Sequence, residues 1–250
     1  MESDIATDNI LFEELENSGV VSMALSEENP VPKKLSGSKY IVTFDPLDGS
    51  SIIGSNWTVG TIFGIWPSDN RNLIGMKCSE MINAGAILYG PRTTLFTFNE
   101  KAKCVQEFKL NENGKWAIAK DNLFIKEKAK TFAPGNLRAV NECEKYKKII
   151  DHYITNCYTL RYSGGLVPDL TQIFIKGEGI LSNICTPSHP PKLRLLYEVG
   201  PLAFLIEKAG GKSSDGKKSI MEYEVTSYDQ RCNFCGGSTK EIEFIESVYK

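Results

Sequence analysis

The residue pattern of this 250-residue chain changes near position 125, and this change limits the choice of fold more than any other feature. Before it, short apolar and β-branched runs alternate with Gly and Asn turns, which is typical of a largely antiparallel sheet. After it, segments with helical spacing predominate. We therefore expect two layered halves of mixed α and β structure, at residues 1–124 and 125–250. The strands expected in the first half are 20–25, 40–44, 58–66, 84–89, 94–98 and 105–110.

Four segments have the apolar spacing of helices. The first, 5–15, is followed by the stop signal Asn17-Ser18-Gly19. Another, 202–209, lies between Pro201 and Gly210-Gly211, which are typical residues for the start and the end of a helix. The remaining expected elements are helices at 141–154 and 239–250 and a strand at 158–162.

The overall charge of the chain is close to zero, with a formal net charge of −2 at pH 7. Such a chain has no overall basic field to hold nucleic acid or an anionic membrane. Charged or Gly residues interrupt every apolar stretch well before it reaches the length that a bilayer requires. The acidic start, Met1 to Asp4, differs from a signal or transit peptide. We expect a soluble protein, and the family resemblance described below implies the cytoplasm or a plastid as its location.

The cysteines and histidines give little indication of chemistry. The seven cysteines are an odd number in a chain too large to need disulfides, which favours a reducing compartment. Cys232 and Cys235 form a Cys-x-x-Cys, but no second Cys or His pair lies near them, so coincidence is favoured over metal or redox use. The two histidines, His152 and His189, support no Ser/His/Asp triad.

The most informative segment is Phe44-Asp45-Pro46-Leu47-Asp48-Gly49-Ser50-Ser51. Two carboxylates stand three positions apart at the end of an expected strand, and a turn there would aim both of them at one point. Hard cations such as Mg²⁺ prefer oxygen ligands of this kind. The small residues that follow offer backbone N–H groups and hydroxyls to a phosphate beside the metal. An ordinary Asp-Pro turn with an Asx cap is the alternative, and these residues alone leave both open.

The same string resembles the metal-binding signature of the fructose-1,6-bisphosphatase family, within the wider inositol-phosphatase superfamily. Ser26-Glu27-Glu28 resembles the upstream acidic pair of that family, and residues 192–198 resemble its downstream substrate and metal segment. These matches keep their order and spacing over nearly the entire chain. The resemblance implies a sugar-phosphatase fold of alternating helix and sheet layers, α+β and α/β in character. It also implies that an N-terminal region present in the family is missing ahead of Asp4.

Three stretches resemble the sedoheptulose-1,7-bisphosphatase branch of the family more than the fructose-1,6-bisphosphatase branch: 90–94, 134–139 and 159–165. The six-carbon branch usually has an aromatic residue where Ala139 stands and a Tyr near Ser182. The resemblance implies Mg²⁺-dependent hydrolysis of the 1-phosphate of sedoheptulose 1,7-bisphosphate, in carbohydrate metabolism such as the Calvin cycle. A fructose-1,6-bisphosphatase or a dual-specificity enzyme is the alternative. An inactive metal-binding subunit is an alternative of another class.

The resemblance further implies two or three Mg²⁺ ions per site, with Mn²⁺ as the alternative cation. Paired divalent ions activate water and stabilise the leaving oxygen in phosphatases. From the residues alone, Glu198 is better explained as a carboxylate near the start of the helix that Pro201 opens. The implied ligands are Glu27, Glu28, Asp45, Asp48, Glu198 and the carbonyl of Leu47.

Asp4 and Glu28 match the residues that polarise the attacking water in the family, although an acidic residue at Asp4 also fits a helix N-cap. Arg161 matches an Arg that reaches a neighbouring subunit's site, which implies a homo-oligomer, either a dimer or a tetramer. The expected partner is a small sugar bisphosphate, with no nucleic acid and no membrane. The implied substrate-binding residues are Asp48, Gly49, Ser50, Ser51, Asn136, Arg161, Tyr162, Lys192 and Arg194.

Overall fold

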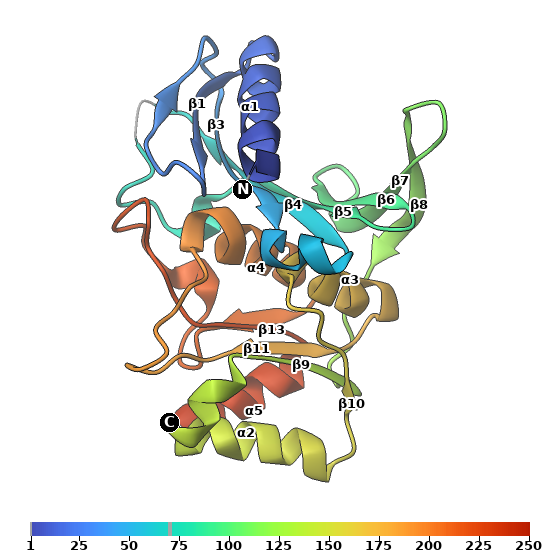
Figure 1. Ribbon diagram of the computed structural model, residues 1–250, viewed down its shortest axis with the longest axis vertical. Coiled ribbons are helices and arrows are strands. Elements are labelled where there is room, and N and C mark those ends of the chain that lie inside the picture. The colour runs from blue at the N-terminus through green and yellow to red at the C-terminus, as the bar shows by residue number, and fades with distance from the viewer. Residues whose placement is uncertain (1, 70–71) are drawn as a thin grey trace.

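The computed structural model describes residues 2–69 and 72–250. Figure 1 shows helices and sheets in successive layers: α1, a first sheet, the pair α3 and α4, a second sheet, and the pair α2 and α5. The alternating layers implied by the family resemblance are thus confirmed. The helices are α1 (Glu2–Asn17), α2 (Glu144–Thr155), α3 (Leu166–Lys176), α4 (Gly200–Lys208) and α5 (Thr239–Tyr249).

The first sheet has the strand order β2-β1-β3-β4-β5-β6-β7-β8. Strands β1 and β3 are parallel, and the other neighbours in the described part of this sheet are antiparallel, as expected from the sequence. The strands are β1 (Val21–Ser26), β2 (Lys33–Lys34), β3 (Tyr40–Asp48), β4 (Val59–Pro67), β5 (Asn83–Tyr89), β6 (Thr93–Asn99), β7 (Cys104–Leu110) and β8 (Trp116–Leu123).

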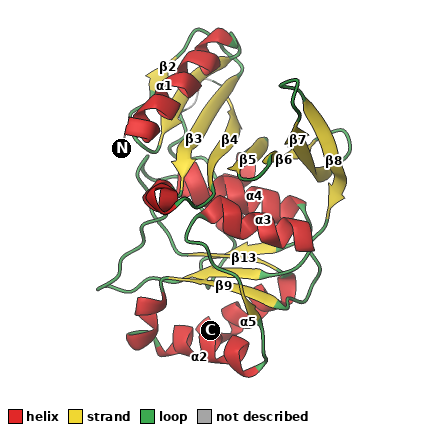
Figure 2. Cartoon of the chain, turned by 45° about the vertical axis from the view of Figure 1, so that its right-hand side comes forward, coloured by secondary structure: helices red, strands yellow, loops and turns green. Residues whose placement is uncertain are grey.

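The second sheet has the order β10-β9-β11-β13-β12. Strand β9 is parallel to both β10 and β11, whereas β13 is antiparallel to β11 and β12. Figure 2 shows α3 and α4 on one face of this sheet and α2 and α5 on the other. The strands are β9 (Thr131–Gly135), β10 (Thr159–Leu160), β11 (Ile180–Asn183), β12 (Lys212–Ser214) and β13 (Phe234–Gly237).

The second half differs from its sequence-based prediction in three places. The strand expected at 158–162 is reduced to β10, because the chain turns toward α3 after it. The helix expected from 141 begins at Glu144, where the Cys143 thiol accepts a hydrogen bond from the Tyr146 N–H. Helix α3 was not predicted, nor were the strands β9, β11, β12 and β13, which are three to five residues long and so give little periodicity.

The largest apolar cluster lies between the first sheet and the α3–α4 layer. Helix α4 is buried from Gly200 through Ile206, as expected of a helix with sheets on both sides. A second cluster joins the second sheet to α2 and α5 through Tyr146, Tyr153 and Ile242. None of the described helices is long and apolar enough to cross a bilayer.

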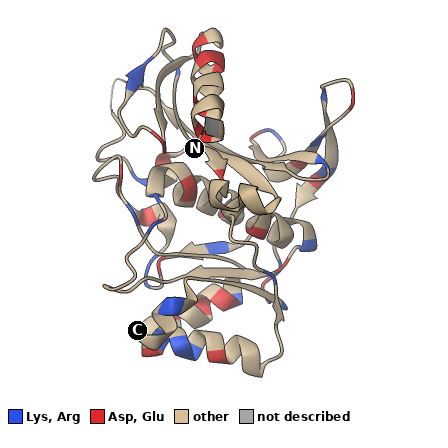
Figure 3. Cartoon of the chain, viewed as in Figure 1, with Lys and Arg blue, Asp and Glu red and all other residues tan. Residues whose placement is uncertain are grey.

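Charged residues of both signs are mixed over most of the described part of the molecule, with α1 as an exception (Figure 3). Figure 3 shows acidic residues without basic ones along α1, and both kinds on α2 and α5.

All seven cysteines are free thiols. Cys232 and Cys235 are buried, and burial raises the pKa of the Cys235 thiol to about 12, which fits structural residues better than reactive ones.

Candidate metal centre and active site

The site begins where the parallel strands β1 and β3 end side by side. Their register pairs Leu25 with Thr43 and Ser26 with Phe44, and the Glu27 N–H donates to the Phe44 carbonyl over 3.0 Å. Parallel strands that end at the same edge of a sheet place the residues that follow them close together. Glu27 is therefore held beside Asp45 by backbone pairing, although 18 positions separate them in the sequence.

A bulge in β3 brings its two carboxylates to one side. Asp45 lies opposite Ile62 and Asp48 opposite Gly60, so three steps along β3 match two along β4. Residues three apart on a regular strand point to opposite faces, and one extra residue restores the same face. The bulge falls at Pro46, which has no N–H to donate to the neighbouring strand. We expected a turn to aim both carboxylates at one point, and the structure does this with a bulge instead.

Glu198 comes from the second half of the chain and reaches the same place. It lies in a single π-helical turn, Leu195–Val199, which runs directly into α4. The Thr43 hydroxyl of β3 donates to the Leu196 carbonyl over 2.8 Å, and this buried bond fixes the turn to the strand. The Glu198 carboxylate also accepts the Arg194 N–H over 2.7 Å. Isolated π turns inside helices are frequent at functional sites.

Asp45, Asp48 and Glu198 form a buried acidic centre, in which one carboxylate oxygen from each lies within 4.8 Å of the others. Burial raises the pKa of Glu198 to about 8 and that of Asp48 to about 6. Burial, with the charges of the other two carboxylates, also raises the pKa of Asp45 well above its usual range. Three buried carboxylates repel one another unless a cation lies between them. The donor set therefore fits a hard divalent cation.

Helix α3 supports the centre where its first turn meets Asp48. Both oxygens of the Asp48 carboxylate are hydrogen-bonded: Oδ1 accepts the Leu166 N–H over 3.1 Å and Oδ2 the Val167 N–H over 2.7 Å. The unpaired N–H groups and the dipole at a helix N-terminus favour an anion there. The orientation of Asp48 is therefore set before any ligand binds.

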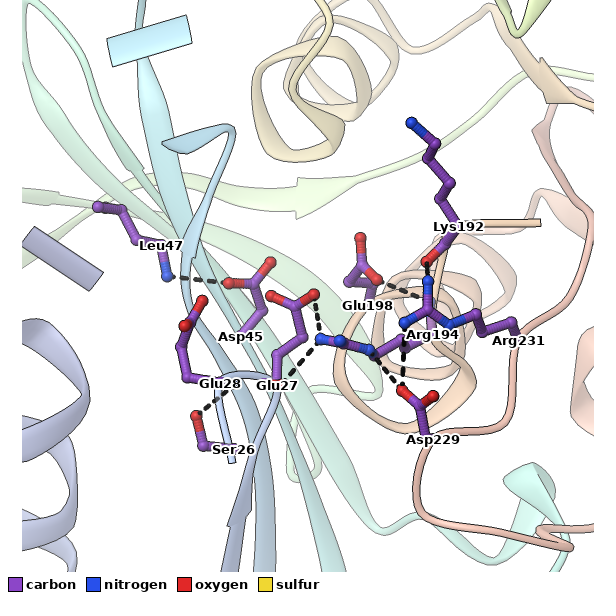
Figure 4. Close-up of polar contacts among 10 residues, drawn as sticks. All are labelled: Ser26, Glu27, Glu28, Asp45, Leu47, Lys192, Arg194, Glu198, Asp229 and Arg231. Atoms are coloured by element: carbon purple, nitrogen blue, oxygen red, sulfur yellow. Dashed lines mark hydrogen bonds and ion pairs between the residues drawn. The ribbon is translucent and has the colours of Figure 1, made fainter. Parts of the chain in front are cut away.

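Arg194 organises the edge of the centre. Figure 4 shows its guanidinium between Glu27 and Asp229. It forms ion pairs with both carboxylates, and Nη1 also donates to the Glu27 carbonyl over 2.8 Å. Burial raises the pKa of Glu27 while the Arg194 charge opposes that shift. Arg194 thus holds Glu27 toward the acidic centre.

The two residues expected to polarise water lie at the same edge. Asp4 lies on the first turn of α1 and is 2% exposed. Its charge raises the pKa of Glu27, although burial, Arg194, Glu28 and Arg231 have larger effects on that pKa. Ser50 forms a side-chain hydrogen bond with the Asp4 carboxylate. Glu28 follows Glu27 and is exposed, with its N–H donated to the Ser26 hydroxyl. Both residues are therefore neighbours of Glu27 at the edge of the centre.

A polar cavity of about 220 Å³ opens onto the acidic centre. It is lined by nine of the predicted site residues: Glu27, Asp45, Leu47, Asp48, Gly49, Ser50, Ser51, Tyr162 and Glu198. Gly49 adopts a left-handed conformation with φ of +84°, which turns the chain from β3 into the 3₁₀ helix Ser50–Ser55. The segment predicted to hold a phosphate therefore lies against the predicted ligands.

The other predicted substrate residues lie outside the cavity lining. Asn136 donates through Nδ2 to the Ile184 carbonyl over 2.9 Å, and exposed Arg161 donates to the Leu160 carbonyl. Lys192 is exposed, and Figure 4 shows its ammonium pointing away from the carboxylates. The single chain thus brings the predicted metal ligands other than the exposed Glu28 to the cavity, and leaves Arg161 and Lys192 at the surface.

Sequence reasoning missed two polar residues of the cavity wall, Asp169 and Asn183. Asn183 ends strand β11, and Asp169 lies in the first turn of α3. A signal for α3 was present in Gly165-Leu166-Val167-Pro168-Asp169, because Pro and an acidic residue in the first turn are typical of a helix start.

Comparison with known proteins places the chain in a family. It matches the N-terminal domain of fructose-1,6-bisphosphatase over residues 1–121 and the C-terminal domain over 125–250. It is 46% identical to the chloroplastic sedoheptulose-1,7-bisphosphatase of Triticum aestivum, covering 98% of this chain and 63% of that protein. It is 38% identical to the class 1 fructose-1,6-bisphosphatase of Syntrophotalea carbinolica, covering 99% of this chain and 77% of that protein.

A solved structure agrees with these matches. The crystal structure of a Toxoplasma gondii protein assigned to the sedoheptulose-1,7-bisphosphatases superposes with a TM-score of 0.91 at 33% identity, covering 98% of this chain and 85% of that one. The present chain spans 63% of the length of the Triticum aestivum relative. Both domain models of the family match along this length, and the chain therefore belongs to the fructose-1,6-bisphosphatase family.

Proposed function

We propose that this chain hydrolyses the 1-phosphate of sedoheptulose 1,7-bisphosphate, giving sedoheptulose 7-phosphate and phosphate, with Mg²⁺ at the acidic centre. The observation that carries the proposal is that Asp45, Asp48 and Glu198 meet at a polar cavity of a size suited to a small ligand. The family membership supports a phosphatase over other metal-dependent chemistry.

The cation would be held by the acidic centre together with Glu27, Glu28 and the Leu47 carbonyl, in two or three positions, with Mn²⁺ as the alternative to Mg²⁺. When bound, divalent cations neutralise the phosphate dianion and the charge that develops on the leaving oxygen. The raised pKa values of the buried carboxylates support this assignment, because a bound cation would offset the burial and the mutual repulsion that raise them.

The residues of the chain then act on water and on the phosphate. Asp4 and Glu28 accept a proton from the water that attacks phosphorus. The bond between phosphorus and the oxygen of sugar carbon 1 breaks, and the sugar oxygen takes a proton from solvent. Backbone N–H groups and hydroxyls of Gly49, Ser50 and Ser51 hold the phosphate during the transfer.

The end of the sugar that does not react carries the second phosphate. Tyr162 lies on the cavity wall, and we assign Asn136, Arg161 and Lys192 to this phosphate. The family match of Arg161, which is exposed in the single chain, supports a homo-oligomer, a dimer or a tetramer, in which Arg161 serves a neighbouring subunit's site. Arg suits bidentate contact with phosphate, and Lys acts as a point charge.

The seven-carbon substrate is favoured by the higher identity to the sedoheptulose-1,7-bisphosphatase, 46%, than to the fructose-1,6-bisphosphatase, 38%. The bacterial similarity keeps a fructose-1,6-bisphosphatase or dual-specificity enzyme as the second candidate.

We also propose that the chain divides into domains at 1–124 and 125–250. The name of the Triticum aestivum relative supports a plastid location over the cytoplasm.

The test is a competition between the two sugars. Phosphate release is measured with equal concentrations of sedoheptulose 1,7-bisphosphate and fructose 1,6-bisphosphate, and the remaining substrates are quantified by mass. We expect the seven-carbon sugar to be consumed first. Preferential loss of the six-carbon sugar would favour the second candidate, and consumption of neither would favour an inactive metal-binding subunit.

A further inference from the structure

Asp169 is a buried carboxylate on the cavity wall that the proposed mechanism does not use. It is 3% exposed and lies in the first turn of α3. Its Oδ1 accepts the Ser163 N–H over 2.7 Å, and its Oδ2 accepts the Gly164 N–H over 3.3 Å. A carboxylate bonded to two backbone donors is held firmly, because charge-assisted hydrogen bonds are the stronger ones.

The turn that Asp169 binds connects two parts of the site. Its residues, 163–165, run from Tyr162 to the first residue of α3, and Gly164 and Gly165 line the cavity with Tyr162. The two glycines offer no side chains of their own, and Gly164 has a φ of +102°, while within the turn the Ser163 hydroxyl accepts the Gly165 N–H over 3.3 Å. Asp169, which lies one helical turn further along the chain, thus supplies side-chain contacts that the two glycines cannot provide.

The turn also lies against the acidic centre. A Cβ added to Gly165 would meet the Pro168 ring at 2.9 Å and Oδ2 of Asp48 at 3.4 Å. The next two residues donate their N–H groups to Asp48. The distance between the predicted cation site and the Tyr162 wall is therefore set by the first turn of α3 and the three residues before it.

We propose that Asp169 is a positioning residue that fixes the wall facing the sugar, residues 162–165, at a set distance from the acidic centre. This inference rests on the proposed function. Asp169 acts through the turn, whereas the orientation of Asp48 depends on the α3 backbone. Loss of the Asp169 carboxylate therefore weakens sugar binding more than cation binding, which it affects only through its charge on Asp48.

The direction in which KM changes distinguishes this positioning role from a purely electrostatic role of the Asp169 charge. Asp169→Asn keeps the size of the side chain but replaces one acceptor oxygen with a donor, so only one of the two turn bonds survives. If Asp169 mattered only as a charge near a phosphorylated ligand, removing it would lower KM. If it positions the wall, removing it raises KM. We expect KM for sedoheptulose 1,7-bisphosphate to rise about 10-fold, with kcat changed much less.

The control is Ile173→Val, a buried substitution one turn further along α3 that lowers stability without touching the turn. Three quantities are compared among wild type, Asp169→Asn and Ile173→Val: KM and kcat, the dissociation constant of Mn²⁺ by calorimetry, and Tm. We expect a raised KM in Asp169→Asn alone, and a Mn²⁺ affinity that changes much less than KM in both variants. An unchanged or lowered KM in Asp169→Asn, or an equal rise in Ile173→Val, overturns it.

A wild-type chain that hydrolyses neither sugar would overturn the proposed function, and the inference is then judged by binding alone. Calorimetry with sedoheptulose 7-phosphate replaces KM. An affinity weakened about 10-fold in Asp169→Asn, but not in Ile173→Val, supports the positioning role. Equal affinities, or no binding to wild type, contradict it.

Discussion

At the residue scale, the centre is built from carboxylates that the fold buries although burial disfavours their charge. Asp48 and Glu198 are each 8% exposed or less, and their pKa values lie at about 6 and about 8. Each keeps a backbone N–H partner, which preserves its direction. A protein tolerates such a group when the surrounding structure holds it for a ligand.

The first prediction concerns pH and the free energy of unfolding without divalent cations. In the folded state the pKa of Glu198 is raised from 4.5 to about 8. The favourable contribution of this carboxyl to the free energy of unfolding is therefore fully present below pH 4.5 and is lost as the pH rises toward 8. We expect Tm in EDTA to fall over this range by more than a few degrees, since ~1 kcal/mol shifts Tm by about 2–4 °C in a chain of this size. Differential scanning calorimetry from pH 5 to 8 measures it.

Two controls accompany that measurement. Glu198→Gln should flatten the pH profile, while Glu14→Gln, an exposed change on α1, should leave it as in wild type. Added Mg²⁺ should raise Tm more at pH 8 than at pH 5, because the carboxylates must be ionised to bind it. An identical slope in wild type and Glu198→Gln would show that this carboxyl does not titrate as stated.

At the element scale, the close approach of α3 to β4 connects the fold to the site. A Cβ on Gly60 of β4 would lie 2.7 Å from the Val167 side chain and 2.5 Å from the Ile87 carbonyl oxygen. Only glycine allows the helix this near, and Val167 is one of the two donors to Asp48. The small residue in β4 therefore determines a hydrogen bond of the acidic centre.

The second prediction follows from this contact. Gly60→Ala should lower stability by about 1–3 kcal/mol through overpacking, and it should weaken Mn²⁺ binding because α3 withdraws from Asp48. Gly54→Ala is the matched control, since a Cβ there meets no atom within 4 Å. Chemical unfolding and calorimetry with Mn²⁺ measure the two effects. Unchanged Mn²⁺ affinity in a destabilised Gly60→Ala protein would mean that α3 does not orient Asp48.

The same elements show how far the sequence alone predicts the site. Asp45 and Asp48 are predictable as a pair, because Pro46 between them indicates a turn or bulge. The approach of Glu198 was expected only from the family resemblance, since 150 positions separate it from Asp48. Asp169 was missed, because its role depends on a side chain that reaches back to two backbone N–H groups.

At the scale of the whole molecule, the centre lies where the two halves of the chain meet. Asp45 and Asp48 come from the first sheet, and Glu198 and the donors to Asp48 come from residues beyond 125. The layered fold was predictable from the change of pattern along the chain. The way the two halves pack against each other was not predictable, because it depends on α3 and α4 lying between the two sheets, which periodicity does not encode.

This arrangement predicts that catalysis requires the cation held between the halves. The decisive measurement is phosphate release from sedoheptulose 1,7-bisphosphate by wild type and by Asp45→Asn, each with Mg²⁺ and with EDTA. Asp151→Asn, an exposed change on α2, is the control. We expect Mg²⁺-dependent turnover in wild type and control, and a rate lower by roughly 100-fold or more in Asp45→Asn. Full Mg²⁺-dependent turnover by Asp45→Asn, or wild-type turnover that EDTA leaves unchanged, would contradict the assignment of the acidic centre.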